Sequence, residues 1–201
     1  MAPASGCAIT LTLCKKMTAR YESSCNTPQI EGFWWREPED ESDKKAFSDI
    51  LEAGCHLLQI LPDSAAPDVP EYVYSVGFYL NLLHPEIMVM GLPSGVSGRM
   101  INDLFQHVAD GNPIWDREYV TYDIEEERIR FAVREITESS YHDYLGYANW
   151  FYRSLRTEVA SAIEYNYPAL QLVWPDSEGK YPWEPGCDLA VVVAQTLAPQ
   201  P

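Results

Sequence analysis

The candidates for acid–base catalysis or metal binding are a few polar side chains in the middle and at the C-terminal end of the chain. His84 and Glu86 flank Pro85, so on a strand they would share a face, whereas a turn at Pro85 would separate them. A metal site would need a third convergent ligand, and we predict none. The favoured interpretation of His84 is a structural histidine bonded to the backbone. The weakest functional alternative is hydrolysis by His84 with Asp176 or Glu184.

A second group of side chains suits anion recognition. Arg128, Arg130 and Arg134 alternate with apolar residues, so they would lie on one face of a strand. Guanidinium groups bind phosphate and carboxylate through paired N–H groups. The structural alternative, and the favoured one, is pairing across the sheet with residues such as Glu118 or Asp123.

A third group combines aromatic rings with polar side chains, the composition of a ligand pocket. The candidate pocket comprises His84, Glu86, Trp150, Gln171, Trp174, Asp176, Trp183 and Glu184. In the structural alternative, the two tryptophans near the C-terminus clamp the last strand against the helix that bears Trp150. Asp176 and Glu184 would then accept hydrogen bonds from the indoles.

The composition of the chain and the motifs that it lacks exclude several classes of function. The chain has 201 residues and a net charge of −16, so its surface repels phosphate backbones and we expect no direct nucleic-acid binding. It contains no membrane-spanning apolar run and no signature of a nucleotide-binding loop, zinc protease or serine hydrolase. Whether the protein is an enzyme stays open. Five scattered cysteines in no zinc-like spacing favour a cytoplasmic protein with reduced thiols: Cys7, Cys14, Cys25, Cys55 and Cys187.

Hydrophobic periodicity supplies the elements that must position these side chains. Val96, Met100, Leu104 and Val108 recur every four residues, which predicts a helix. Alternating apolar residues around the run of glutamates at 125–127 predict a hairpin. The expected elements, in chain order, are a helix from Asp43 to Gly54, strands over 56–62, 72–82 and 86–92, a helix over 94–110, a hairpin over 120–133, a helix over 137–166 and a strand over 169–174.

This order predicts an α+β domain with a mainly antiparallel sheet, or a partly closed, split-barrel-like β-barrel, with two or three packed helices. We expect a poorly ordered N-terminal extension over 1–42, the domain over 43–190 and a C-terminal tail over 191–201. The layout is similar to the opening of flavin-reductase-like split barrels, and FMN enters as a candidate cofactor through this analogy alone.

A pattern in four parts resembles the DUF4262 family over about residues 43–186. Its parts are Tyr74-Ser75-Val76-Gly77, then His84-Pro85-Glu86 with Gly91-Leu92-Pro93, then Asn149-Trp150-Phe151-Tyr152, then Gln171-Leu172-Val173-Trp174-Pro175-Asp176 with Pro182-Trp183-Glu184. The resemblance implies a bacterial or phage-associated protein and a domain boundary. It implies no activity.

These observations favour a binding or interaction module. The acidic surface would suit a basic protein partner, in an immunity or accessory role, or the module would bind a small-molecule ligand. The alternative is a flavin- or nucleotide-binding split barrel that uses the arginine face and the aromatic pocket.

Overall fold

The computed structural model describes residues 38–62, 69–124, 126–154 and 167–196. The first element, α2 (Glu41–Glu52), begins because the carboxylate of Asp40 accepts a hydrogen bond of 2.9 Å from the N–H of Asp43. It therefore starts two residues before the expected position. It ends where Gly54 takes a φ of +93°, as predicted for a glycine after a helix.

The segment expected as one strand over 72–82 is two elements. Strand β2 (Tyr72–Val76) ends at Gly77, and the short helix α3 (Phe78–Leu82) follows. Gly77 has a φ of +122°, and a Cβ there would lie 2.7 Å from the carbonyl oxygen of Gly54. The glycine therefore marks the end of the strand, at a close approach of the backbone of Gly54.

The prediction of one continuous helix over 137–166 is wrong for the described part of this range. Helix α5 (Glu138–Tyr144) and helix α6 (Gly146–Ser154) are separated by Leu145, which has non-helical backbone angles and a fully buried side chain. Gly146, a weak helix former, follows directly and begins the second helix. The regularly spaced apolar residues of this segment are buried in the core, but they belong to two helices instead of one. Residues 155–166 lie outside the described part of the chain.

The remaining elements lie close to their expected positions, with one addition. They are β1 (His56–Ile60), β3 (Glu86–Met90), α4 (Ser94–Ala109), β4 (Tyr119–Ile124), β5 (Glu127–Glu135), β6 (Ala169–Val173) and α7 (Leu189–Ala194). Helix α7 was not predicted, and it crosses the boundary expected at residue 190. The extension over 1–37 and the end of the tail over 197–201 lie outside the described residues.

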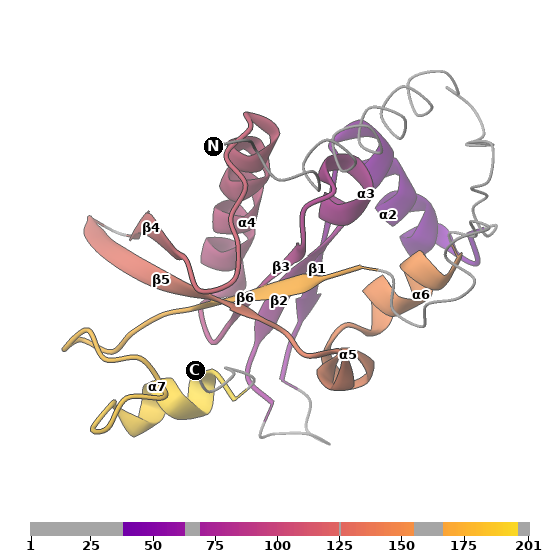
Figure 1. Cartoon of the computed structure of the whole chain (residues 1–201). Coiled ribbons are helices and arrows are strands. Elements are labelled where there is room, and N and C mark those ends of the chain that lie inside the picture. The colour runs from indigo at the N-terminus through magenta and orange to yellow at the C-terminus, as the bar shows by residue number, and fades with distance from the viewer. Residues whose placement is uncertain (1–37, 63–68, 125, 155–166, 197–201) are drawn as a thin grey trace.

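The six strands form one open sheet in the order β1-β2-β3-β6-β5-β4 (Figure 1). Every neighbouring pair is antiparallel except β3 and β6. The fold is therefore α+β with a mainly antiparallel sheet, as predicted. The sheet does not close, so the split-barrel alternative does not describe it.

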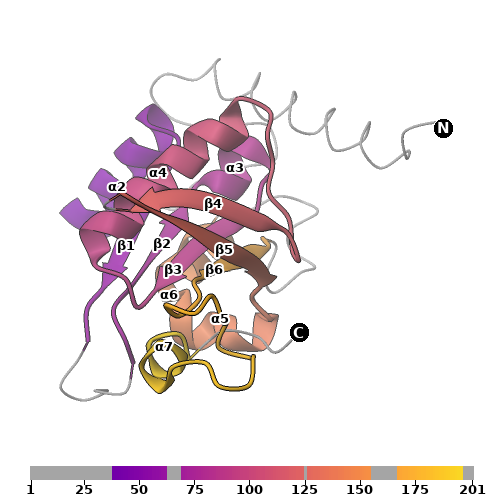
Figure 2. The same cartoon turned by 90° about the vertical axis from the view of Figure 1, so that its left-hand side faces the viewer.

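Each face of the sheet has its own apolar core. Helix α4 contributes Met100 and Leu104 to the core that contains Ile87 and Leu172. The opposite core is built by α2, α5 and α6 together with buried side chains of β2 and β3. Figure 2 shows α4 and the pair α5 and α6 on opposite sides of the strands. No helix in the described residues is long and apolar enough to cross a membrane.

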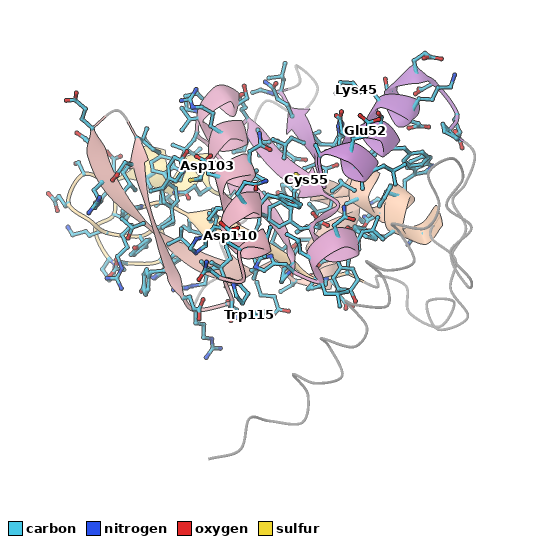
Figure 3. All side chains as sticks on the ribbon, turned by 90° about the horizontal axis from the view of Figure 1, so that it is seen from above. Lys45, Glu52, Cys55, Asp103, Asp110 and Trp115 are labelled. Atoms are coloured by element: carbon cyan, nitrogen blue, oxygen red, sulfur yellow. The ribbon has the colours of Figure 1, made fainter. Side chains whose placement is uncertain are left out.

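Seen from above, Cys55 lies between Glu52 of α2 and Asp103 of α4 in the projection (Figure 3). The thiol is buried, and burial raises its pKa to about 12. A thiol held in the protonated form is a poor nucleophile, so Cys55 is a core residue.

Candidate functional site

The most completely paired polar side chain is Glu86, the first residue of β3, which is 1% exposed. Its carboxylate accepts hydrogen bonds from the hydroxyl of Ser75 (2.5 Å), the N–H of Gly77 (3.0 Å), the N–H of Tyr79 (2.9 Å) and the phenol of Tyr152. The carboxylate thus joins β2, α3 and α6 to the sheet.

Burial raises the pKa of Glu86 above its ordinary value, although the hydrogen bonds, that of Ser75 foremost, lower it. Burial and the neighbouring carboxylate also raise the pKa of Tyr152. Glu86 is enclosed, and its partners among the described residues all lie inside the fold. Three separate parts of the family pattern converge on this group, and their convergence is structural.

His84 is also structural. It is 1% exposed, its Nδ1 lies 2.7 Å from the carbonyl oxygen of Pro85, and its Nε2 lies 3.1 Å from the nitrogen of Ile114. Nε2 also lies 2.9 Å from the carbonyl oxygen of Ile114, so a neutral ring donates either from Nδ1 to Pro85 or from Nε2 to Ile114. Burial lowers the pKa of His84, which favours this neutral form. The predicted backbone hydrogen bond is therefore present, and His84 shares no partner with Glu86.

The hydrolase alternative finds no support in this geometry. Both ring nitrogens of His84 are engaged with the backbone inside the protein, whereas Asp176 and Glu184 belong to the C-terminal loop. No group of three potential metal ligands occurs among the described residues.

The C-terminal carboxylates hold a loop rather than the indoles. Asp176 accepts hydrogen bonds of 2.9 Å from the backbone N–H groups of Glu178, Lys180 and Asp188, and these bonds, that of Lys180 foremost, lower its pKa. Glu184 accepts from the N–H of Tyr181 at 2.7 Å. Both carboxylates thus fix the path of the chain after β6.

The two tryptophans expected to clamp one helix lie apart from it. The indole of Trp174 donates to the carbonyl oxygen of Met90 at 2.9 Å, and its backbone N–H and C=O both pair with the side-chain amide of Gln195. Trp150 instead stacks on Phe47 of α2, at 5.9 Å between ring centroids. The clamp against the Trp150 helix is therefore wrong, and α7, through Gln195, holds the end of β6.

The third tryptophan belongs to a cluster that we call the guanidinium–aromatic face, formed by Tyr119, Arg130, Arg134, Tyr181 and Trp183. The guanidinium of Arg130 lies 3.7 Å from the centroid of the Tyr119 ring, and that of Arg134 lies 4.5 Å from the Trp183 ring. Tyr181 stacks on Trp183 at 5.1 Å and 7°, and its hydroxyl donates to the carbonyl oxygen of Arg130 at 2.8 Å. Cation–π contacts and a hydrogen bond thus order both arginines and the loop.

The three arginines of β5 divide into two kinds. Arg128 makes a bidentate ion pair with Asp123, at 2.9 and 3.2 Å, as the structural alternative predicts. Arg130 and Arg134 form no ion pair with any carboxylate in the described residues. In a chain with 30 acidic and 14 basic residues, two such guanidiniums stand out.

Gln171 lies next to this face. It sits directly opposite Arg134 in the antiparallel register of β6 and β5, so the two side chains are on the same face of the sheet. Gln171 is fully buried, and neither its side-chain nitrogen nor its oxygen has a hydrogen-bond partner within the described ranges. Since an unpaired buried amide costs free energy, such a group calls for an explanation.

The structure thus brings together Arg130, Arg134 and Trp183, with Gln171 opposite Arg134 in the sheet, and distributes the other predicted residues. Sequence reasoning missed the rings of Tyr119 and Tyr181. Tyr181 and Trp183 lie in a turn in which the N–H of Glu184 donates to the carbonyl oxygen of Tyr181 at 2.8 Å, so their spacing in the sequence did not indicate that the rings stack.

Nothing among curated proteins or solved structures matches this chain. A family model described as "Domain of unknown function (DUF4262)" matches residues 49–188, which is more than half of the chain. The resemblance found in the sequence is confirmed: the chain belongs to the DUF4262 family.

Proposed function

We propose that this protein is a binding module that recognises a negatively charged group through the guanidinium–aromatic face. The observation that carries the proposal is that Arg130 and Arg134 are ordered on aromatic rings yet form no ion pair with a described carboxylate. The neighbouring Arg128, which is paired with Asp123, shows how the same strand satisfies a guanidinium when charge balance alone is needed.

The geometry favours recognition of an anion by the N–H groups at the edges of the two guanidiniums. A guanidinium that lies over a ring still presents its in-plane N–H groups, which can form paired hydrogen bonds with a carboxylate or phosphate. Nη1 of Arg134 donates to the carbonyl oxygen of Val133 at 2.7 Å, which leaves its other N–H groups for an anion. The rings themselves already contact one another and the arginines. An anionic group therefore suits this face better than the stacking of a flavin, and the open sheet removes the layout that suggested FMN.

The test is a titration of isotopically labelled protein with phosphate and with succinate at low ionic strength. We expect saturable chemical-shift changes at the indole N–H of Trp183 and at the Nε–H groups of Arg130 and Arg134. The double variant Arg130→Gln, Arg134→Gln should lose them. Arg128→Gln is the matched control, since that guanidinium is paired, and it should retain them. Unsaturable shifts, or equal shifts in the double variant, would overturn the proposal.

A second candidate rests on the net charge of −16. In this version the protein acts in the cytoplasm as an accessory or immunity-type module whose acidic surface binds a basic protein partner. Co-purification at low and at high salt tests it. A partner lost at high salt supports the electrostatic version, because exposed charges are screened. A partner held equally at both salt concentrations counts against it.

A further inference from the structure

Strand β4 forms one edge of the sheet and pairs only with β5 among the described strands. Figure 1 shows β4 at the outer side of the sheet, and in Figure 2 it runs in front of the other strands, facing the viewer. In both views no described element lies against its outer side. An uncovered edge strand presents unpaired backbone groups to any extended chain that meets it.

The hydrogen-bond register identifies these groups. The N–H of Val133 donates to the carbonyl oxygen of Glu118 at 2.9 Å, so this pair is bonded across the two strands. Bonded and non-bonded pairs alternate in an antiparallel ladder. Tyr119, Thr121 and Asp123 are therefore the residues whose N–H and C=O groups point away from β5. All three are exposed.

A β-bulge precedes β4, because the N–H of Arg117 and the C=O of Glu118 both pair with Val133, but β4 itself carries few of the features that block strand addition. Residues 119–124 contain no lysine and no proline, and their one carboxylate, Asp123, is paired with Arg128. Tyr119, Thr121 and Tyr122 are residue types that favour strands. The edge is thus chemically suited to accept another strand.

Arg130 would give this edge a preference for a segment with negatively charged side chains. It is opposite Thr121 in the register, so its side chain is on the same face of the sheet as the side chains of Tyr119 and Thr121. Its guanidinium lies 3.7 Å from the centroid of the Tyr119 ring, so it contacts a side chain of β4, the edge strand. A strand added at β4 would place every second side chain on this face, and the one nearest Thr121 would lie closest to this cation.

We propose that the β4 edge binds an extended polypeptide segment with acidic side chains at alternate positions. The segment pairs its backbone with Tyr119, Thr121 and Asp123, and one of its carboxylates meets the guanidinium of Arg130. This rests on the proposed function for the carboxylate contact and goes beyond it for the backbone pairing.

The test uses a short capped peptide of alternating valine and glutamate, bound to the full chain and followed by amide hydrogen exchange. We expect exchange at Thr121 and Asp123 to slow by about tenfold or more on binding. The same peptide with alternate backbone nitrogens methylated should fail to slow it. The alternating valine–glutamine peptide should bind about tenfold more weakly, as should the glutamate peptide to Arg130→Gln, whereas Arg128→Gln should bind it normally.

Each other outcome has a defined meaning. If phosphate and succinate titrate the arginines but no peptide binds, the edge inference fails and the proposed function stands. Equal binding of the methylated peptide overturns backbone pairing. Equal binding of the glutamine peptide overturns the acidic occupant and, if Arg130→Gln is also without effect, the carboxylate contact as well. Concentration-dependent protection of Thr121 without peptide, with dimers in sedimentation, would make a second copy the occupant and overturn the proposal.

Discussion

The phenol of Tyr152, in α6, donates a hydrogen bond to the buried carboxylate of Glu86, in β3, and so ties the covering helix to the centre of the sheet. The two residues are 66 positions apart. The same phenol oxygen lies 3.2 Å from the nitrogen of Gly77, so one contact links a helix, a strand and the strained turn between β2 and α3.

Removing this phenol should destabilise the fold. Tyr152→Phe takes one donor from a buried carboxylate, and we expect a loss of about 1.5–3 kcal/mol in the free energy of unfolding. Tyr119→Phe, at an exposed ring, is the control and should stay within about 0.5 kcal/mol. Denaturant unfolding of both variants measures the difference. Equal stabilities would show that the Glu86 contact contributes nothing.

The carboxyl of Glu86 should give stability a definite pH dependence. Its pKa in the folded protein is raised above the ordinary 4.5. Its contribution is therefore full below about pH 4.5 and is lost as the pH rises through the folded pKa. The stability difference between the wild type and Glu86→Gln should shrink as the pH increases from 4.5. A difference that grows with pH would mean that the carboxylate is stabilised in its charged form.

His84 should give the stability of the fold the opposite pH dependence to that of Glu86. Its pKa is lowered from 6.5 by burial, so its contribution is present above pH 6.5 and is lost as the pH falls through the folded pKa. The stability of the wild type relative to His84→Gln should decrease between pH 6.5 and lower values. Chemical unfolding across this range measures it, and a flat difference would contradict a neutral, buried imidazole.

Two buried glutamines should respond in opposite ways to replacement by methionine. Gln171 has no partner in the described part of the structure, so Gln171→Met should stabilise the free protein by about 1 kcal/mol or more. Gln195 pairs with both backbone groups of Trp174, so Gln195→Met should cost about 1–3 kcal/mol. Thermal unfolding compares them. A destabilised Gln171→Met would reveal a bound water or ligand on the amide.

Two glycines offer a similar contrast. Gly77→Ala introduces a Cβ 2.7 Å from a backbone oxygen at a φ of +122°, and we expect it to cost at least about 2 kcal/mol. Gly98→Ala, in α4, meets only an ordinary contact of 3.6 Å with Leu57 and should stabilise the helix by about 0.5–1 kcal/mol. Unfolding curves of the two variants separate the outcomes. A neutral Gly77→Ala would remove the strain argument.

Local patterns in the sequence determined most elements and the fold class. The four-residue spacing of α4 and the two-residue alternation of the hairpin produce their elements because each buries one face wherever it packs. Alternation also placed Arg128, Arg130 and Arg134 together correctly. It could not show that Gly77 ends a strand or that Leu145 separates two helices, because both depend on contacts made by distant segments.

The partners of each polar side chain were decided only by the tertiary structure. Sequence alone gave no means to separate Arg128, which pairs with Asp123, from Arg134, whose guanidinium lies over the Trp183 ring and donates to the carbonyl oxygen of Val133. Hydrogen bonds and cation–π contacts act over a few ångströms between residues far apart in the chain. The residue types and their strand face were therefore fixed locally, whereas the site itself arises from how β6, β5 and the C-terminal loop are packed together.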